Sequence, residues 1–202
     1  MTKEPSTTPA RPAGELRADA RQNHARLLTA ASQAFAEKGA DAPLEDIAKR
    51  AGVGIGTLYR HFPTRLDLQA AAFRNQVTVL CGDAMEMLDR AEPERAFFTW
   101  IQIMAGYFIS KRGLSKAVMQ ALGRDAEVLE VCWTRLRETT ERTLTLAQQG
   151  GLIRADVSAV DVMRLAHGVV AATEHDPDQA PRLLAIMVDG LRAMPGDATA
   201  QA

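Results

Sequence analysis

The chain has 202 residues, of which 47% are hydrophobic and 24% charged, and its formal net charge is −1 at pH 7. This composition excludes a chain too polar to bury a core and is typical of a soluble globular protein. No apolar run reaches the roughly 18 residues of a membrane span, and the N-terminus lacks the apolar stretch of a secretory signal. We therefore expect a cytoplasmic protein with no membrane partner.

The charge is distributed unevenly. Residues 1–75 carry 11 Lys or Arg against 8 Asp or Glu, whereas residues 76–202 carry 13 against 17. A mildly basic first third ahead of an acidic remainder fits a DNA-contacting head on a regulatory body. The two cysteines, Cys81 and Cys132, lie inside helical patterns, which predicts buried thiols and not a disulfide framework.

In chain order, residues 1–15 are rich in Pro, Thr and charge and are expected to be a disordered tail. Leu27, Leu28, Ala31, Phe35 and Ala36 recur at helical spacing, which predicts a first helix that ends before Gly39. Shorter helices are predicted over 43–51 and 55–62, and a longer one over 64–90.

The remainder also has helical spacing, with predicted helices over 93–113, 114–122, 125–149, 158–175 and 178–194. Pro93 suits a first helical turn, and Ser158 suits an N-cap. Outside the ambiguous segment 76–80, no alternating β-branched run predicts a strand. We therefore predict an all-α protein of about nine helices, followed by a second disordered tail at 195–202.

The stretch DIAKRAGVGIGTLYRHFPTR, residues 46–65, has the pattern of a helix-turn-helix. Gly52 follows the first of its two short helices, where a positive φ is needed and glycine adopts it without a steric cost. Leu58 and Phe62, four residues apart, predict the buried face of the second helix. An ordinary helical hairpin with a solvated face is the alternative interpretation of the bare pattern.

The second short helix leaves several positions without a core to fill, and these suit a DNA groove. Gly56 permits close approach of the backbone, Thr57, Tyr59 and His61 can donate to phosphates, and Arg60 can bridge guanine O6 and N7. Ile55 offers an apolar base contact, and Arg65 a further phosphate contact. The predicted DNA-binding residues are Ile55, Gly56, Thr57, Tyr59, Arg60, His61 and Arg65.

Residues 21–68 closely resemble the N-terminal DNA-binding domain of the TetR family of transcriptional regulators. The resemblance is carried by Gly52-Val53, Gly56-Thr57-Leu58-Tyr59 and His61-Phe62. It implies a DNA-binding domain over 16–65 and a ligand-binding and dimerisation domain over 66–194. It also implies a homodimer that binds a palindromic operator in double-stranded DNA and is released by a small-molecule effector of unknown identity.

Two positions depart from the family pattern. Many members open the second helix with Ser or Thr, whereas Ala42-Pro43-Leu44 supplies no hydroxyl here, and Gly54 stands where serine is common. We therefore expect no hydroxyl contact to DNA from either position.

In the body, aromatic and sulfur-containing side chains at helical spacing predict either a plain core or the wall of an effector pocket. Trp133 and Tyr107 each add a polar group that can orient a ligand. The predicted pocket residues are Phe97, Trp100, Ile101, Met104, Tyr107, Phe108, Met119, Leu122, Trp133 and Leu136.

The last two predicted helices are apolar around much of their circumference, which favours a four-helix dimer interface over helices that only cover their own subunit. The predicted interface residues are Val162, Leu165, Ala166, Val169, Val170, Leu183, Leu184, Met187 and Leu191.

Other function classes find little support in the sequence. The chain has no phosphate-binding loop, dinucleotide fingerprint or paired-carboxylate motif, so we predict no catalytic residue and no cofactor. His167, Glu174, His175 and Asp176 lack a tight ligand spacing, so we predict no metal site. An architectural DNA-binding protein without an effector is the remaining alternative, and the long body argues against it.

Overall fold

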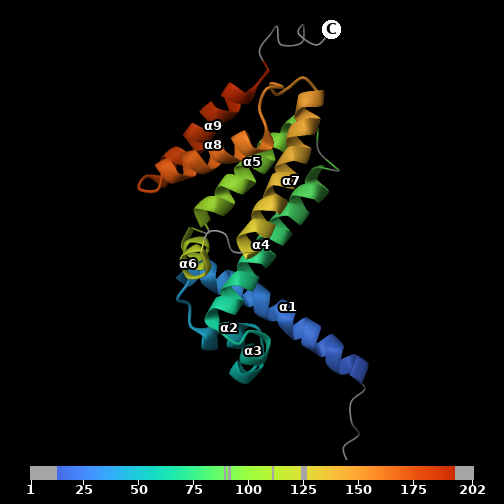
Figure 1. Ribbon diagram of the computed structural model, residues 1–202, viewed down its shortest axis with the longest axis vertical. Coiled ribbons are helices and arrows are strands. Elements are labelled where there is room, and N and C mark those ends of the chain that lie inside the picture. The colour runs from blue at the N-terminus through green and yellow to red at the C-terminus, as the bar shows by residue number, and fades with distance from the viewer. Residues whose placement is uncertain (1–12, 89, 91, 111, 124–126, 194–202) are drawn as a thin grey trace, which may run out of the picture. The chain divides into compact units, whose positions relative to one another are not determined.

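The computed structural model describes residues 13–88, 90, 92–110, 112–123 and 127–193. Most of the residues predicted to form the two tails, at 1–12 and 195–202, lie outside this part of the chain. The described residues form an all-α protein, as predicted, and contain an isolated bridge between Ile153 and Arg192 but no strand (Figure 1).

Nine α-helices and one short 3-10 helix follow one another in the described residues. Their bounds are α1 (Ala13–Lys38), α2 (Leu44–Arg50), α3 (Ile55–His61), α4 (Arg65–Leu88), α5 (Pro93–Ser110), α6 (Arg112–Leu122), α7 (Glu127–Gln149), α8 (Ala159–Ala172), the 3-10 helix η1 (Pro177–Gln179) and α9 (Ala180–Leu191). α1 begins earlier than predicted, because Ala13 to Glu15 fall in the segment expected to be disordered. None of the described helices is both long and apolar enough to cross a membrane.

Contacts divide the chain into two compact units, Met1–Leu68 and Gln69–Ala202. The N-terminal unit, called the head below, holds α1, α2, α3 and the first turn of α4. The C-terminal unit, called the body below, holds the rest of α4 and the helices after it. α4 is continuous across this boundary, so no loop separates the two units.

The corner between α2 and α3 forms as the sequence predicts. Gly52 has a φ of 67°, its N–H donates to Lys49 O, and the next N–H, of Val53, donates to Ala48 O at 3.0 Å. This pair of bonds closes the C-terminus of α2 and requires the left-handed conformation that glycine adopts most easily. After this corner α3 packs against α2, with Leu58 fully buried.

Two helix starts are fixed by reciprocal capping. Ser158 Oγ accepts from Asp161 N while the Asp161 carboxylate accepts from Ser158 N, which confirms the predicted N-cap of α8. Thr64 and Asp67 form the same arrangement at the start of α4, with Thr64 N donating to Asp67 Oδ2 at 2.9 Å and Asp67 N donating to Thr64 Oγ1 at 3.1 Å. α4 therefore begins at a defined residue directly after the helix-turn-helix.

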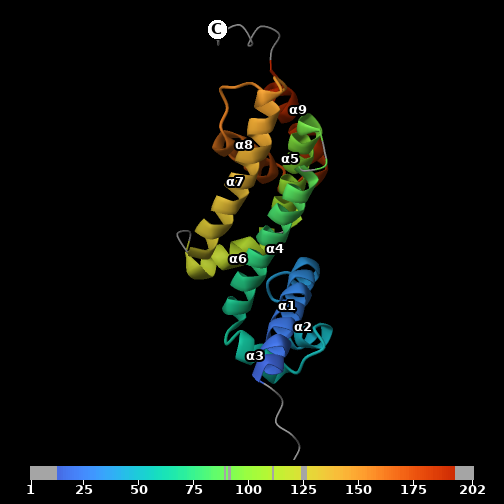
Figure 2. The same cartoon turned by 90° about the vertical axis from the view of Figure 1, so that its right-hand side faces the viewer.

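The core of the C-terminal unit centres on α5, which packs against α7 and α8, while α8 packs against α9 (Figure 2). Trp100 is fully buried on α5 and its indole N–H donates to Thr140 Oγ1 on α7 at 2.9 Å. Thr140 is buried as well, and its hydroxyl donates to Leu136 O one turn earlier at 2.7 Å. The polar atom of the largest core side chain is thus satisfied inside the protein.

The two thiols are buried, as predicted. Burial raises the pKa of Cys132 to about 11 and also raises the pKa of Cys81 above its ordinary value. Both side chains therefore stay protonated near pH 7, in the form that packs as a small apolar group.

Candidate nucleic-acid interface

The second helix of the helix-turn-helix, α3, has one buried and one open face. Leu58 is fully buried and Phe62, directly after the helix, is also buried, so this side anchors α3 to the head. Tyr59 and Ile55 keep 47% and 37% of their surface exposed, and Arg60 is exposed beside them. A short helix that leaves its aromatic and basic side chains in solvent has the composition of a groove-reading surface.

Six of the seven predicted DNA contacts lie on α3 itself. Gly56 is exposed, and a Cβ added to it would meet nothing within 4 Å, so the open face has room for close approach of a ligand. Thr57 and His61 are half-buried at the edges of the face. The structure thus brings Ile55, Gly56, Thr57, Tyr59, Arg60 and His61 onto one short helix, and their role in DNA binding remains a prediction.

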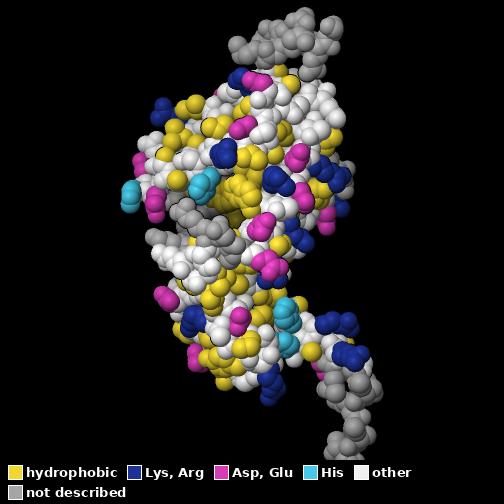
Figure 3. All heavy atoms as spheres, in the orientation of Figure 1, with side chains coloured by type: hydrophobic (Ala, Val, Ile, Leu, Met, Phe, Trp, Pro, Cys, Tyr) yellow, Lys and Arg dark blue, Asp and Glu magenta, His cyan; other side chains and the backbone are white. Residues whose placement is uncertain are grey.

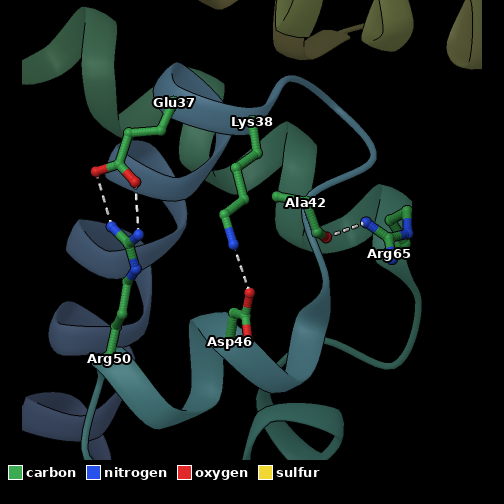
Figure 4. A network of polar contacts seen from close by, with 6 residues as sticks. All are labelled: Glu37, Lys38, Ala42, Asp46, Arg50 and Arg65. Carbon is green, nitrogen blue, oxygen red and sulfur yellow. Dashed lines mark hydrogen bonds and ion pairs between the residues drawn. The ribbon is translucent and has the colours of Figure 1, made fainter.

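The seventh predicted contact, Arg65, has a role within the head. Its Nη1 donates to Ala42 O at 2.7 Å (Figure 4). The same Nη1 also donates to Ala40 O at 3.3 Å. These carbonyls belong to the connection between α1 and α2, so the guanidinium ties the start of α4 to that connection. Sequence spacing gave no sign of this bond, because the acceptors lie more than twenty residues away from Arg65.

Two ion pairs hold the end of α1 to α2. Arg50 Nη1 donates to Glu37 Oε1 at 2.8 Å, and Lys38 Nζ donates to Asp46 Oδ2 at 2.6 Å (Figure 4). The hydrogen bonds from these cations hold the pKa of Glu37 and the pKa of Asp46 below their ordinary values. Because all four groups are solvated, the pairs orient α2 more than they stabilise it.

His24 on α1 lies against the last turn of α3, a contact that the sequence did not predict. Its ring centroid is 5.8 Å from that of His61 and 5.0 Å from that of Phe62. The two histidines of the N-terminal unit appear side by side in Figure 3. Partial burial, and then the neighbouring His61, lower the pKa of His24, so His24 carries less positive charge near pH 6 than a solvated imidazole does.

The ten predicted pocket residues separate into two groups. Phe97, Trp100, Ile101, Met104, Tyr107 and Leu136 are buried, and Phe108 is half-buried against the ring of His167 at 5.6 Å. Met119, Leu122 and Trp133 are exposed by 39%, 41% and 42%. Ile101 also lines a groove of about 520 Å³ between α5 and α9, where the Arg192 guanidinium lies 4.8 Å from the Phe98 ring centroid. The assignment of these residues to an effector pocket stays a prediction.

The predicted interface residues on α8 and α9 also separate by burial. Val162, Ala166, Val170, Leu184 and Leu191 are buried in their own unit, where they join α8 and α9 to the core. Leu165 is exposed by 47%, and Val169, Leu183 and Met187 are half-buried. These four side chains and Leu191 line a groove of about 590 Å³ along α8 and α9. Val157, Ile186 and the small residues Gly168, Ala172 and Gly190 also line it, as do two arginines, Arg154 and Arg164.

Comparison with known proteins identifies both halves of the chain. The family model for bacterial regulatory proteins of the tetR family matches residues 27–72, and the model for the C-terminal domain of SbtR-like transcriptional regulators matches residues 92–193. Among curated proteins, an HTH-type transcriptional regulator from Staphylococcus aureus (strain USA300) is 27% identical over 108 residues, which are 53% of this chain and 57% of that protein. The chain therefore spans little more than half the length of the curated relatives that it matches.

Solved structures match over more of the chain. The TetR transcriptional regulator SCO0520 from Streptomyces coelicolor is 33% identical, with a TM-score of 0.73 over 85% of this chain and 99% of that one. A TetR transcription regulatory protein from Mycobacterium vanbaalenii is 31% identical, with a TM-score of 0.70 over 88% and 99%. A regulator of this kind acts by binding DNA and not by catalysis. Because family models match both the N-terminal and the C-terminal part of the chain, it belongs to the TetR family of DNA-binding transcriptional regulators.

Proposed function

We propose that the protein is a repressor that binds a palindromic operator as a homodimer and is released by a small-molecule effector. The observation that carries the proposal is the open face of α3, where Tyr59, Arg60 and Ile55 are exposed while Leu58 is fully buried. In a homodimer two such helices would enter successive major grooves on one face of the duplex, roughly 34–36 Å apart.

The groove along α8 and α9 supports the dimeric part of the proposal. Ile186 and Leu165 are exposed by 57% and 47%. Both line the same apolar groove, so they are not isolated apolar side chains on a polar surface. A two-fold axis brings the same patch of two subunits together, so a self-complementary apolar groove suits a second copy of the chain. Small residues in the groove allow the helices of the two copies to approach closely.

The proposed response to an effector requires coupling between the body and the head. α4 is the element that enters both units, and Leu68 and Phe73 on it are buried. An effector that favours one body conformation would change DNA affinity through this helix. By linkage, DNA would weaken effector binding by the same factor.

Selection of bound sequences from random duplex DNA tests the proposal. We expect the enriched sequences to contain an inverted repeat whose half-sites are centred about one helical turn, or a multiple of it, apart. Sedimentation of the protein with the enriched duplex should show two chains for each inverted repeat. Enrichment of a single unrepeated half-site, bound by one chain, would contradict the dimeric operator.

Replacing Arg60 with alanine should relax the preference for one base pair in each half-site. If Arg60 bridges guanine O6 and N7, its loss costs about 1–3 kcal/mol at that position, which is roughly a 5- to 150-fold loss of discrimination. The measurement is a comparison of dissociation constants for duplexes that carry each of the four base pairs at that position.

The matched variant is Tyr59→Phe, which removes only a hydroxyl from the same exposed face. Since that hydroxyl is predicted to donate to phosphate, the variant should weaken binding to all of the duplexes by a similar factor. An Arg60→Ala protein that keeps the wild-type base preference would show that Arg60 does not read a base.

A further inference from the structure

The first half of α1 is not explained by the core of the head. The buried side chains of α1 are Leu27, Ala30, Ala31, Ala34 and Phe35, which all lie in its second half. From Gly14 to Arg26, every side chain whose burial the structure describes is exposed or half-buried. More than two turns of this 26-residue helix therefore extend outside the core that α2 and α3 help to form.

In the exposed part of α1, Arg17, Arg21 and His24 share one face, whereas Arg26 lies about 180° around the helix from Arg17. Arg17, Arg21 and His24 follow one another at i, i+4 and i+7, which is the spacing of a single helix face. Asp19 lies about 200° around the helix from Arg17, because each residue turns an α-helix by about 100°. We call the face formed by Arg17, Arg21 and His24 the α1 ridge.

The α1 ridge ends beside α3. Its last member, His24, contacts the ring of His61 at the end of α3, with the ring planes 68° apart. Both views show the start of α1 and α3 at the same end of the N-terminal unit (Figures 1 and 2). Figure 3 shows Lys or Arg side chains further along α1, beyond the paired histidines. A duplex that meets the open face of α3 at His61 would therefore lie close to the α1 ridge.

We propose that the α1 ridge binds the phosphate backbone of DNA just outside the bases that α3 contacts, with Arg17 and Arg21 as the phosphate ligands. The proposal rests on the proposed DNA contact of α3. The seven residue steps of helix from Arg17 to His24 span about 10 Å, which is close to the axial rise of three base pairs. A guanidinium is suited to phosphate because its planar donors match the oxygens in geometry and charge.

The test is the salt dependence of DNA binding by the full chain in which both arginines are replaced, Arg17→Gln with Arg21→Gln. Two probes are used: the selected operator with about ten extra base pairs at each end, and the same operator cut at the outer edges of its half-sites. Glutamine keeps the helix propensity and removes the charge. The matched control is Arg95→Gln with Arg137→Gln, which removes two exposed cations from the C-terminal unit.

On the flanked duplex, the double variant should bind about tenfold or more weakly at low salt. The slope of log K against log salt should fall by about 0.9 for each phosphate that the variant no longer neutralises. The base preference of the double variant should not change, since phosphate contacts carry no sequence information. On the cut duplex, wild type and double variant should bind alike, and the control should match wild type on both probes.

Each contrary result identifies what has failed. A double variant that keeps the wild-type slope on the flanked duplex overturns the α1 ridge and leaves the proposed function intact. An equal loss on the flanked and the cut duplex overturns the placement of the ridge outside the half-site. If the wild-type protein selects no duplex at all, the proposed function fails and the ridge fails with it.

Discussion

Replacing Trp100 with alanine should lower the free energy of unfolding of the C-terminal unit by about 3–5 kcal/mol, the range found for large aromatic side chains in cores. Trp100 is fully buried between α5 and α7, so its removal leaves a cavity that the surrounding helices close only in part. It also removes the indole N–H that donates to the buried hydroxyl of Thr140. Chemical denaturation at a fixed protein concentration measures the change, since the stability of a dimer depends on concentration.

The chain supplies its own control for this prediction. Trp133 is the other tryptophan, and it keeps 42% of its surface exposed on α7. Trp133→Ala creates no enclosed cavity and should lower the free energy of unfolding by less than Trp100→Ala does. Equal losses in the two variants would show that the packing of α5 against α7 does not dominate the stability of this unit.

The second large effect is expected at the groove on α8 and α9. Leu165→Glu combined with Ile186→Glu should raise the dissociation constant of the proposed homodimer by about a hundredfold or more. A two-fold interface would contain four new carboxylates, and an unpaired charge taken out of water costs several kcal/mol. Sedimentation velocity over a concentration series should then show mostly single chains, and affinity for the inverted repeat should fall with dimerisation.

Val79→Glu is the control for the dimer variant. Val79 is 51% exposed on α4 and does not line the groove on α8 and α9. It receives the same new charge, so its self-association should match that of the wild-type protein. A protein that stays dimeric with glutamate at both Leu165 and Ile186 would place the contact between copies on another surface.

Several helix boundaries could be predicted from sequence because local chemistry sets them, whereas the predicted end of a helix at Gly113 is wrong, since Gly113 lies inside α6. Gly52 closes α2 with a positive φ, Pro93 begins α5, and Ser158 caps α8, each where the sequence indicates. The open and buried sides of α3 also follow from spacing, since Leu58 and Phe62 anchor the helix and leave Tyr59 outside. These features need only the residues within one or two turns.

Contacts between distant segments could not be predicted in this way. Arg65 donates to carbonyls in the connection between α1 and α2, and His24 contacts the end of α3, although neither pair is close in sequence. Which side chains of an apolar helix face are buried also depends on the helices that pack against it. Ala36 belongs to the apolar stripe of the first helix by spacing but is exposed, whereas Ala30 and Ala34 are buried. Periodicity indicates a face, and only packing shows which of its members are covered.

The passage of α4 through the unit boundary has a consequence for recombining this protein with its relatives. Because Leu68 and Gln69 are neighbours inside one uninterrupted helix, the head cannot be exchanged at a flexible joint. A fusion made there has to preserve the helical phase: one additional residue would turn the rest of α4 by about 100° and advance it by about 1.5 Å. An exchange at this position therefore keeps the buried side of α4 in phase when the number of residues between the Thr64 cap and the first buried position after Leu68 stays the same.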